Sequence, residues 1–371
     1  MPFDAMPEGP TTAPAPLLYV LPAKCEAAAE IASLRRLGLT VIPFLAGEEA
    51  MPAPLPRNPL ALARATRLAF ASGDLPARDA LRQGARIAAA FQAWGCGAIH
   101  VAAGDAAATA ALVGARLAGA PVSLAPAALD APGLGAKLRS ADLLFATGAA
   151  MADQCRALAP ATPLRLLPPA IACTTPWAAG GAAAPDRNGR LLCLDPMRGG
   201  AGVPMLLAAL ASLPPGLRPV VDLIGSGPFF DAWRAEALER GVSDQARFLG
   251  ARGPDWLAAE APRYLGFVAA EGSVEDALRA MALRLPVIGP ATAGMREVVA
   301  PDAGHLVPPG DARALARALR WLAILPDDQR RLMGEAGRDR VLGGHTMATR
   351  AAALAQGLAP LLAGSAARLA A

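Results

Sequence analysis

The sequence predicts an α/β protein made of two doubly wound domains, and three observations lead to this fold class. Short apolar runs alternate with helical stretches along most of the chain, as parallel strands joined by helices require. The 371 residues exceed the size at which one hydrophobic core keeps growing. A stretch rich in Gly, Ala and Pro divides the alternating pattern into two halves, so we expect one domain on each side of it.

The first domain is expected at residues 17–173 and opens with a strand–helix–strand unit. Two apolar runs, Leu17–Leu21 and Leu39–Leu45, flank a helical stretch, Glu26–Leu37, that stops at Gly38. Such a unit implies parallel strands joined by a right-handed crossover. Further along, the sequence predicts a polar, arginine-containing helical region at about Leu60–Trp94, strands at Ala98–Val101, Pro121–Leu124, Leu143–Thr147 and Leu164–Leu167, and a helix at Ala106–Leu117.

A second alternating set follows the divider. Residues 174–189 show no period and predict a linker, so we place the second domain at 190–345. Residues 1–16 predict a loose tail, and residues 346–371 a helix expected to pack on the first domain. The predicted strands are Arg190–Leu194, Val220–Ile224, Arg247–Leu249, Leu265–Ala269 and Pro286–Ile288, and the predicted helices are Val203–Leu213, Phe229–Arg240 and Val274–Leu283. Ligands of such sheets bind beyond the carboxyl ends of the strands, so we expect the site in a cleft between the domains.

Composition argues against several classes of protein. Hydrophobic residues make up 54% of the chain and charged residues 18%, which argues against disorder. No run of about 18 uncharged apolar residues occurs, so no membrane-spanning helix is predicted. The first residues, MPFDAMPEGPTTAPAP, contain Asp, Glu and several prolines before any apolar run, unlike a secretory signal. We therefore expect a cytoplasmic protein.

Metal binding and nucleic-acid binding are not expected either. The cysteines form no CxxC pair and the histidines are scattered, so reduced thiols and no metal site are predicted. The net charge of +4 comes almost wholly from arginine, and no basic cluster is interleaved with aromatic residues. His100 ends an apolar strand, where a buried structural histidine is expected. The cysteines are Cys25, Cys96, Cys155, Cys173 and Cys193, and the other histidines are His305 and His345.

A glycine turn follows one strand of the second domain. Gly225, Ser226 and Gly227 come directly after the apolar run Val220–Ile224 and open a helix. Glycines let a backbone approach a ligand closely, and a helix N-terminus offers free N–H groups to a phosphate. The spacing is not GxGxxG, so an ordinary strand-to-helix turn remains the alternative interpretation.

Three acidic residues follow the predicted strand Leu265–Ala269. Glu271, Glu275 and Asp276 lie near its carboxyl end, and paired carboxylates there are suited to acid–base chemistry. The alternative is structural, because Ser273 can cap the helix Val274–Leu283 and the helix dipole favours acids in the first turn. Capping does not explain Glu271, which precedes that helix.

Motifs of the second domain follow one another in the order seen in family 4 glycosyltransferases, which the chain resembles. They are LIGSGP at 223–228, ARFLG at 246–250, EG at 271–272, RAMALRLPVIG at 279–289, AGMREVV at 293–299 and GHLVPPGD at 304–311. The first domain is similar to a narrower group, the colanic-acid-type exopolysaccharide glycosyltransferases. It carries EIASLRRLGLTVIPF at 30–44, ARLAGAPVS at 115–123 and KLRSADLLFAT at 137–147.

The resemblance implies a GT-B fold, in which two Rossmann-like domains bind a nucleotide-sugar between them. It further implies transfer of the sugar to a glycan acceptor with retention of configuration, without a metal or other cofactor. The donor would be a UDP- or GDP-sugar. Glu271 and Asp130 match catalytic positions. The positions expected to bind the donor are Gly225, Ser226, Gly227, Arg198, Glu275 and Met295.

Several charged positions of the family hold other residues in this chain. Pro196 and Ala201 stand where the family has an Arg and a Lys that neutralise the leaving diphosphate. Arg279 stands at the glutamate that accepts hydrogen bonds from the ribose hydroxyls, which an arginine cannot do. Ala127 replaces the histidine that contacts the donor sugar, and Ala102 replaces a second cleft histidine.

The sequence therefore predicts a family 4-like protein of surface or exopolysaccharide biosynthesis with weakened or lost sugar transfer. Two alternatives remain open: a fully active retaining enzyme with a rearranged donor site, and a non-catalytic module that binds a glycan, a nucleotide or a partner glycosyltransferase. Peripheral contact with the inner membrane through Arg64, Arg67, Arg82 and Arg86 is a further expectation, with a solvated helix face as its alternative.

Overall fold

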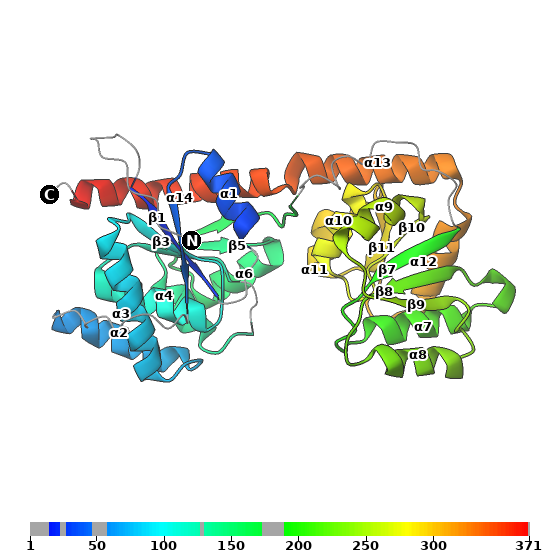
Figure 1. The fold of residues 1–371 in the computed structure, drawn as a ribbon, viewed down its shortest axis with the longest axis horizontal. Coiled ribbons are helices and arrows are strands. Elements are labelled where there is room, and N and C mark those ends of the chain that lie inside the picture. Colours follow the sequence, from blue (N-terminus) through cyan, green and yellow to red (C-terminus); the bar gives the residue numbers. More distant parts are fainter. Residues whose placement is uncertain (1–14, 23–26, 47–57, 127–129, 173–188, 370–371) are drawn as a thin grey trace. The chain divides into compact units, whose positions relative to one another are not determined.

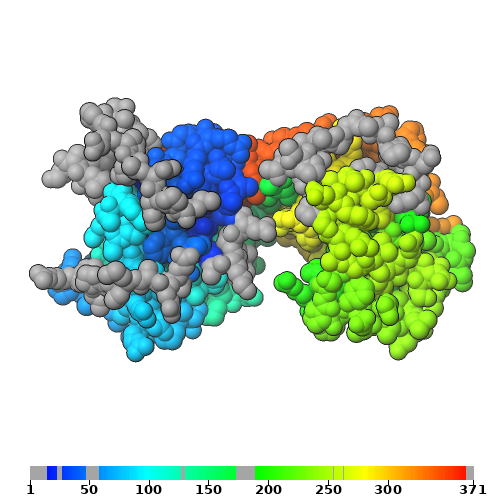
Figure 2. Space-filling model, in the orientation of Figure 1, coloured from blue at the N-terminus to red at the C-terminus, as the bar shows by residue number. Residues whose placement is uncertain are grey.

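The computed structural model describes residues 15–22, 27–46, 58–126, 130–172 and 189–369; the remaining residues are grey in Figures 1 and 2. The expected linker, apart from Gly189, lies outside the described residues, as do residues 1–14 of the expected tail and position Ala127. The chain divides into two compact units. Unit 1 comprises Met1–Leu167 and Ala351–Ala371, and unit 2 comprises Pro168–Arg350.

Unit 1 contains a six-stranded parallel sheet in the order β2-β1-β3-β4-β5-β6. The chain runs from β1 to β2 on one side and then crosses to β3 on the other, which is the reversal of a doubly wound sheet. The strands are β1 Leu17–Leu21, β2 Val41–Leu45, β3 Ala98–Val101, β4 Val122–Leu124, β5 Leu143–Ala146 and β6 Leu164–Leu166.

Helices cover both faces of this sheet (Figure 1). One face carries α2, α3 and α4, and the other carries α1 and the unit 1 part of α14. Two glycines, Gly84 of α3 and Gly114 of α4, let these helices pack closely, because a Cβ on either would overlap the facing helix. The helices are α1 Ala28–Arg36, α2 Pro59–Ser72, α3 Ala77–Ala93, α4 Ala106–Ala118, α5 Leu134–Ser140, α6 Ala149–Leu158 and α14 Met347–Leu369.

The long C-terminal helix supplies part of the unit 1 core. Leu354, Leu358 and Leu362 of α14 are buried in one apolar cluster with Tyr19 and Phe145 of the sheet. Gly357 fits against the Phe145 ring, where a Cβ would come within 2.6 Å of a ring carbon. The last residues of the chain therefore complete a core that the first residues begin.

Unit 2 contains a second six-stranded parallel sheet, in the order β12-β11-β10-β7-β8-β9. Its strands are β7 Arg190–Leu194, β8 Val220–Ile224, β9 Ala246–Gly250, β10 Gly266–Val268, β11 Val287–Pro290 and β12 Gly304–Val307. Its helices are α7 Gly202–Ser212, α8 Phe230–Glu239, α9 Pro254–Glu260, α10 Val274–Ala282, α11 Ala293–Val298, α12 Ala312–Ile324 and α13 Asp327–Gly344. Helices α7, α8 and α12 cover one face, and α9, α10, α11 and α13 the other.

Two parallel sheets flanked by helices confirm the predicted fold class. In unit 2 the chain reverses between β7 and β10, which are neighbours. The loops that leave these two strands therefore meet beyond the carboxyl ends of the strands, where doubly wound folds bind their ligands. Within the described part of the chain, no helix is long and apolar enough to cross a membrane.

Candidate functional site

The loop after β7 begins with a buried acid. Asp195 is 4% exposed, and its Oδ1 accepts a hydrogen bond of 2.7 Å from the backbone N–H of Met197. Its Oδ2 is buried and has no hydrogen-bond partner among the described residues. The hydrogen bond helps to hold Met197 at a φ of 52°, in the left-handed region that residues with a Cβ rarely adopt. A hydrogen bond to the Asp195 carboxylate thus fixes this loop, in the segment where the resemblance predicts two cations.

The electrostatics of this loop favour the protonated form of Asp195. Burial raises the pKa of this carboxyl, because water no longer solvates its charge, and the N–H of Met197 offsets part of the rise. The nearby carboxylates of Glu271 and Asp276 raise the same pKa further. An anion that approaches this loop therefore meets acidic groups.

Glu271 lies in the turn after β10 and reaches the same loop. Its Oε1 accepts a hydrogen bond of 2.5 Å from the backbone N–H of Gly202, the first residue of α7. A Cβ on Gly200 would lie 2.5 Å from this oxygen, and one on Gly202 would lie 2.7 Å from it. Helix N-termini attract anions, and here the chain's own carboxylate occupies that position. Two glycines provide the room for it.

Arg279 is tied to the acids of its own helix. Its Nη2 lies 2.5 Å from Glu275 Oε1, and its Nη1 lies 2.9 Å from Asp276 Oδ1. Ser273 Oγ accepts a hydrogen bond from the Asp276 N–H, so the capping role considered for Ser273 is present. Helix α10 begins at Val274, so Glu271 precedes this helix and does not lie on one helix face with Glu275.

The glycine turn after β8 packs against the β7 loop. A Cβ on Gly225 would overlap the carbonyl oxygen of Asp195, and one on Gly227 would overlap the backbone of Pro196 and Met197. Close packing therefore requires glycine at both positions whether or not a ligand binds there, which fits the alternative interpretation of an ordinary strand-to-helix turn. Ser226, between them, is exposed beside the acidic loop.

Two other predicted donor residues lie in contrasting surroundings. Arg198 is exposed and forms no hydrogen bond or ion pair with any described residue. It is a cation on the loop that contains Asp195, and its guanidinium is available to an anion. Met295 is fully buried in the core, and its backbone N–H donates to Thr292 Oγ1. Its side chain therefore faces protein and not a ligand.

The predicted residues of unit 1 lie at the carboxyl ends of β3 and β4. Asp130 is exposed on the loop between β4 and α5, and Ala102 directly follows β3. His100 is fully buried, and its Nδ1 lies 2.8 Å from Ser123 Oγ. It is a core histidine, as expected. Asp130 belongs to unit 1, whereas Asp195, Glu271 and Asp276 come together in unit 2.

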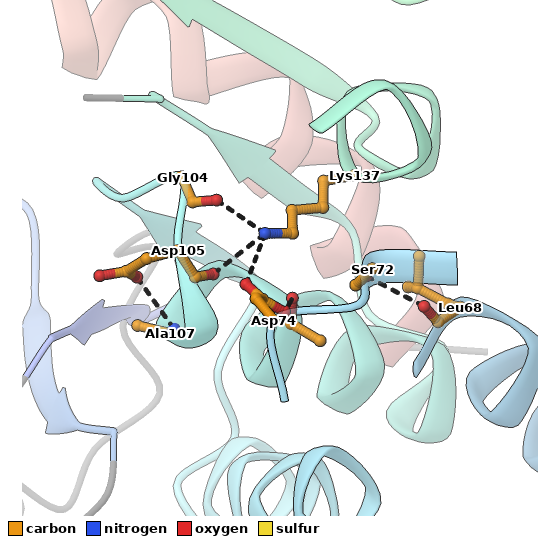
Figure 3. Close-up of polar contacts among 8 residues, drawn as sticks. Leu68, Ser72, Asp74, Gly104, Asp105, Ala107 and Lys137 are labelled. Carbon is orange, nitrogen blue, oxygen red and sulfur yellow. Dashed lines mark hydrogen bonds and ion pairs between the residues drawn. The ribbon is translucent and has the colours of Figure 1, made fainter. Parts of the chain in front are cut away.

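A buried ion pair that the sequence did not reveal holds the strand-end loop of β3 (Figure 3). Lys137 Nζ of α5 lies 2.6 Å from Asp74 Oδ2 and donates to the carbonyl oxygens of Gly104, at 2.8 Å, and Asp105, at 3.5 Å. Thr109 Oγ1 donates to the other oxygen of Asp74. The three N–H donors of the Lys137 ammonium group thus have three acceptors, and these bonds fix the loop before α4 to α5. Only the rarity of lysine in this chain sets the residue apart in the sequence.

Comparison with known proteins gives one family match. Residues 184–340 match the family model described as Glycosyl transferases group 1, which covers most of unit 2. No curated protein sequence matches the chain.

Solved structures resemble the chain over nearly its whole length. A glycosyltransferase from Rickettsia africae ESF-5 has a TM-score of 0.71 at 15% identity, with 94% of this chain and 99% of that chain covered. Sucrose-phosphate synthase from Thermosynechococcus elongatus has a TM-score of 0.65 at 20% identity, with 94% and 100% covered. Anabaena HepE in complex with UDP and glucose has a TM-score of 0.64 at 15% identity, with 93% and 100% covered. At these identities the likeness establishes the shared two-domain architecture.

Proposed function

Starting from a Glycosyl transferases group 1 domain at residues 184–340 on a two-domain GT-B fold, we propose a glycosyltransferase-like protein with weakened or lost sugar transfer. Its place would be in surface or exopolysaccharide biosynthesis, as a relative of family 4. A UDP- or GDP-sugar is the donor class that fits, and the HepE complex with UDP and glucose supports this class.

The observation that carries the proposal is that the β7 loop has neutral residues at the two predicted cation positions and carboxylates close to it. When a glycosyl bond to a diphosphate breaks, negative charge grows on the leaving group and must be stabilised. Pro196 and Ala201 stand at the two positions where the resemblance predicts cations. The carboxyl of Asp195, which directly precedes Pro196, is buried, and that of Glu271 occupies the α7 N-terminus. Loss of stabilisation for the leaving group follows.

Arg279 supports the same conclusion for the ribose. A guanidinium has only donors, and ribose hydroxyls need an acceptor to receive their own protons. Both ion pairs of Arg279 lie within α10, so this arginine neutralises the acids Glu275 and Asp276 and leaves less capacity for a ligand. Glu275 Oε1 already accepts a hydrogen bond from Arg279, so Oε2 is the oxygen of this carboxylate left to accept from a ribose hydroxyl.

If residual transfer occurs, Glu271 and Asp130 remain the proposed catalytic groups, and the Gly225–Gly227 turn with Arg198 and Glu275 remains the proposed donor site, whereas the buried side chain of Met295 is not part of it. The non-catalytic alternative is favoured by one contact, the hydrogen bond from Gly202 to Glu271. In that case the protein would bind a glycan, a nucleotide or a partner glycosyltransferase without transferring sugar.

The test measures donor turnover by the full chain. Purified protein is incubated with a panel of UDP- and GDP-sugars, release of UDP or GDP is recorded, and thermal shifts are measured with the same compounds. We expect no more than slow donor hydrolysis. A variant that combines Pro196→Arg, Ala201→Lys and Arg279→Glu should gain a nucleotide-dependent rise in melting temperature, because it restores the predicted cations and the ribose acceptor.

A matched control separates a restored site from a general change of charge. Arg263→Glu makes the same charge reversal on an exposed arginine that pairs with Glu260 away from the β7 loop. This variant should gain no thermal shift. Rapid turnover by the unmodified chain would refute the proposal of weakened transfer.

We further propose a cytoplasmic location with peripheral membrane contact through α2. Leu60 and Phe70 on this helix are 68% and 73% exposed, and Arg64 and Arg67 are exposed between them. The helix has no acidic residue. Apolar side chains spaced along a cationic helix face suit the interface of an anionic membrane.

A further inference from the structure

An open groove runs along the edge of the unit 2 sheet, beside strand β12. It has a volume of about 480 Å³. Strand β12 is the last strand of the sheet, so one of its sides has no neighbouring strand. The strand contributes residues 305–307 to the lining, Pro308 follows it, and α12 contributes Ala314, Arg317, Ala318 and Trp321. Volumes of this order suit a small molecule or one or two units of a larger one.

The wall of the groove is aromatic and apolar. The Trp321 and His305 rings have centroids 5.4 Å apart and are inclined by 45°. Trp321 is half-buried and His305 is exposed, so part of this aromatic surface is open to solvent. The small side chains of Ala314 and Ala318 also line the groove. A ligand with a flat apolar face can therefore rest against this wall.

Arg317 lines the groove, and two further arginines of α12 lie on the same side of the helix. Arg313, Arg317 and Arg320 are exposed and separated by three or four residues, so they lie along one side of the helix. Among the described residues, none of them forms a hydrogen bond or an ion pair. The helix itself contains no acidic residue.

Some arginines of other unit 2 helices have an acidic partner four residues away. Arg240, the residue after α8, pairs with Glu236, and Arg331 of α13 pairs with Glu335. On α12, neighbouring like charges repel, and Arg313 lies in the first turn, where the helix dipole disfavours a cation. This repulsion weakens the helix. A bound anion would offset it and would explain why the helix carries these arginines.

We propose that this groove binds an acidic sugar residue of a glycan. The carboxylate of a uronic acid would pair with the guanidinium of Arg317, whose planar donors match a carboxylate. The C–H face of the sugar ring would pack on Trp321. Arg313 and Arg320, on either side of Arg317, extend the cationic surface toward the neighbouring units of an acidic chain.

An acidic saccharide fits these contacts better than a nucleic acid. Single-stranded nucleic acids bind where several aromatic side chains stack successive bases along a basic groove. Here the rings of one tryptophan and one histidine lie next to each other, and the remaining lining apart from Arg317 is aliphatic. The groove contains none of the proposed donor residues, so this proposal stands or falls independently of the nucleotide-sugar site.

The test titrates the full chain with trigalacturonic acid and with its carboxyl-reduced, neutral counterpart, using isothermal calorimetry at low salt. We expect the acidic trisaccharide to bind at least about tenfold more tightly than the neutral one. Arg317→Gln should weaken binding by about tenfold or more, since one charge-assisted pair is lost. Arg240→Gln, which removes the exposed arginine directly after α8, should leave the affinity within about twofold of the unmodified chain.

Three results would overturn the proposal. The first is absence of binding at millimolar trisaccharide. The second is an affinity that Arg317→Gln leaves unchanged. The third is binding of inorganic phosphate or a hexathymidine oligonucleotide as tightly as the acidic sugar, which would mark a surface for anions in general. Trp321→Ala, which removes the ring, should weaken binding of the acidic and the neutral trisaccharide alike; unchanged binding of both would contradict packing of the sugar on this ring.

Discussion

At the scale of single residues, Lys137 has the most demanding environment. Its side chain is fully buried, and that of Asp74 is 8% exposed. A buried charge is strongly unfavourable unless it is paired and all its hydrogen bonds are satisfied, and this ammonium group meets both conditions. The pair therefore specifies one arrangement of the loop before α4.

Lys137→Met should destabilise the protein by about 3 to 5 kcal/mol, because it leaves the Asp74 carboxylate buried without its cation. Urea denaturation followed by circular dichroism measures this change. Arg156→Met is the control, since the pair of Arg156 with Asp153 is exposed and should be worth no more than about 1 kcal/mol. Equal losses in the free energy of unfolding for the two variants would contradict a stabilising role for the buried pair.

Asp195 makes the stability of the protein depend on pH. Its pKa is raised in the folded state, so the folded protein binds this proton more tightly than the unfolded chain does. Stability must therefore fall as pH rises above the unfolded value near 3.8, and the cost persists at neutral pH.

Asp195→Asn should consequently stabilise the protein at neutral pH, since an amide keeps the acceptor for the Met197 N–H and cannot ionise. The gain should vanish at a pH below the unfolded pKa, where both variants are neutral. Chemical denaturation at several pH values measures it. Asp244→Asn, at an exposed position, should show no such trend; a gain that did not depend on pH would contradict the assignment to ionisation.

Residues with local partners were predictable from the sequence, and residues with distant partners were not. The Ser273 cap depends on a residue three positions away, so sequence spacing indicates it. The contacts of Lys137 with Asp74 and of Glu271 with Gly202 span 63 and 69 residues and depend on the assembled sheet. Sequence alone could name Glu271 as a candidate but could not show that its carboxylate already has a partner.

At the scale of elements, most strands and helices follow their sequence signals. The region expected as helical at Leu60–Trp94 forms two helices, α2 and α3. Gly73 adopts a φ of 68° at the end of α2, and Pro76 precedes α3. Such a glycine and a proline at these positions are ordinary stop and start signals. The division into α2 and α3 was thus visible in the sequence, whereas the close packing of α3 on α4 through Gly84 is visible only in the structure.

Helix α2 also carries a prediction about membranes. The full chain should bind vesicles that contain phosphatidylglycerol more strongly than vesicles of phosphatidylcholine, because arginines are attracted to anionic lipid. Phe70→Ser should weaken this binding by about tenfold or more, since burial of a phenylalanine is worth about 1.5 to 3 kcal/mol. Sedimentation with vesicles measures both effects.

Leu238→Ser provides the comparison for Phe70→Ser. Leu238 is 70% exposed on α8, a helix that contains Asp231, Glu236 and Glu239. Removal of this leucine should leave vesicle binding unchanged. If the two variants lost binding equally, α2 would have no special role at the membrane.

At the scale of the whole molecule, the alternation of strands and helices was enough to predict two doubly wound sheets. This works because each β-α-β unit can close in only one hand and needs a parallel neighbour. The signals that persist at Gly225, Gly227 and Gly304 serve backbone packing, since a Cβ on any of them would overlap a neighbouring strand or loop. A fold can thus keep its glycines while charged positions beside them change.

The use of α14 in unit 1 has a consequence for how the protein is made. A ribosome completes β1–β6 and then the whole of unit 2 before it reaches Leu354, Leu358 and Leu362. Until those residues emerge, the sheet face around Tyr19 and Phe145 lacks its apolar cover. The unit that is synthesised first is therefore the one that finishes folding last, and its exposed face is an obvious place for a chaperone to bind a nascent chain.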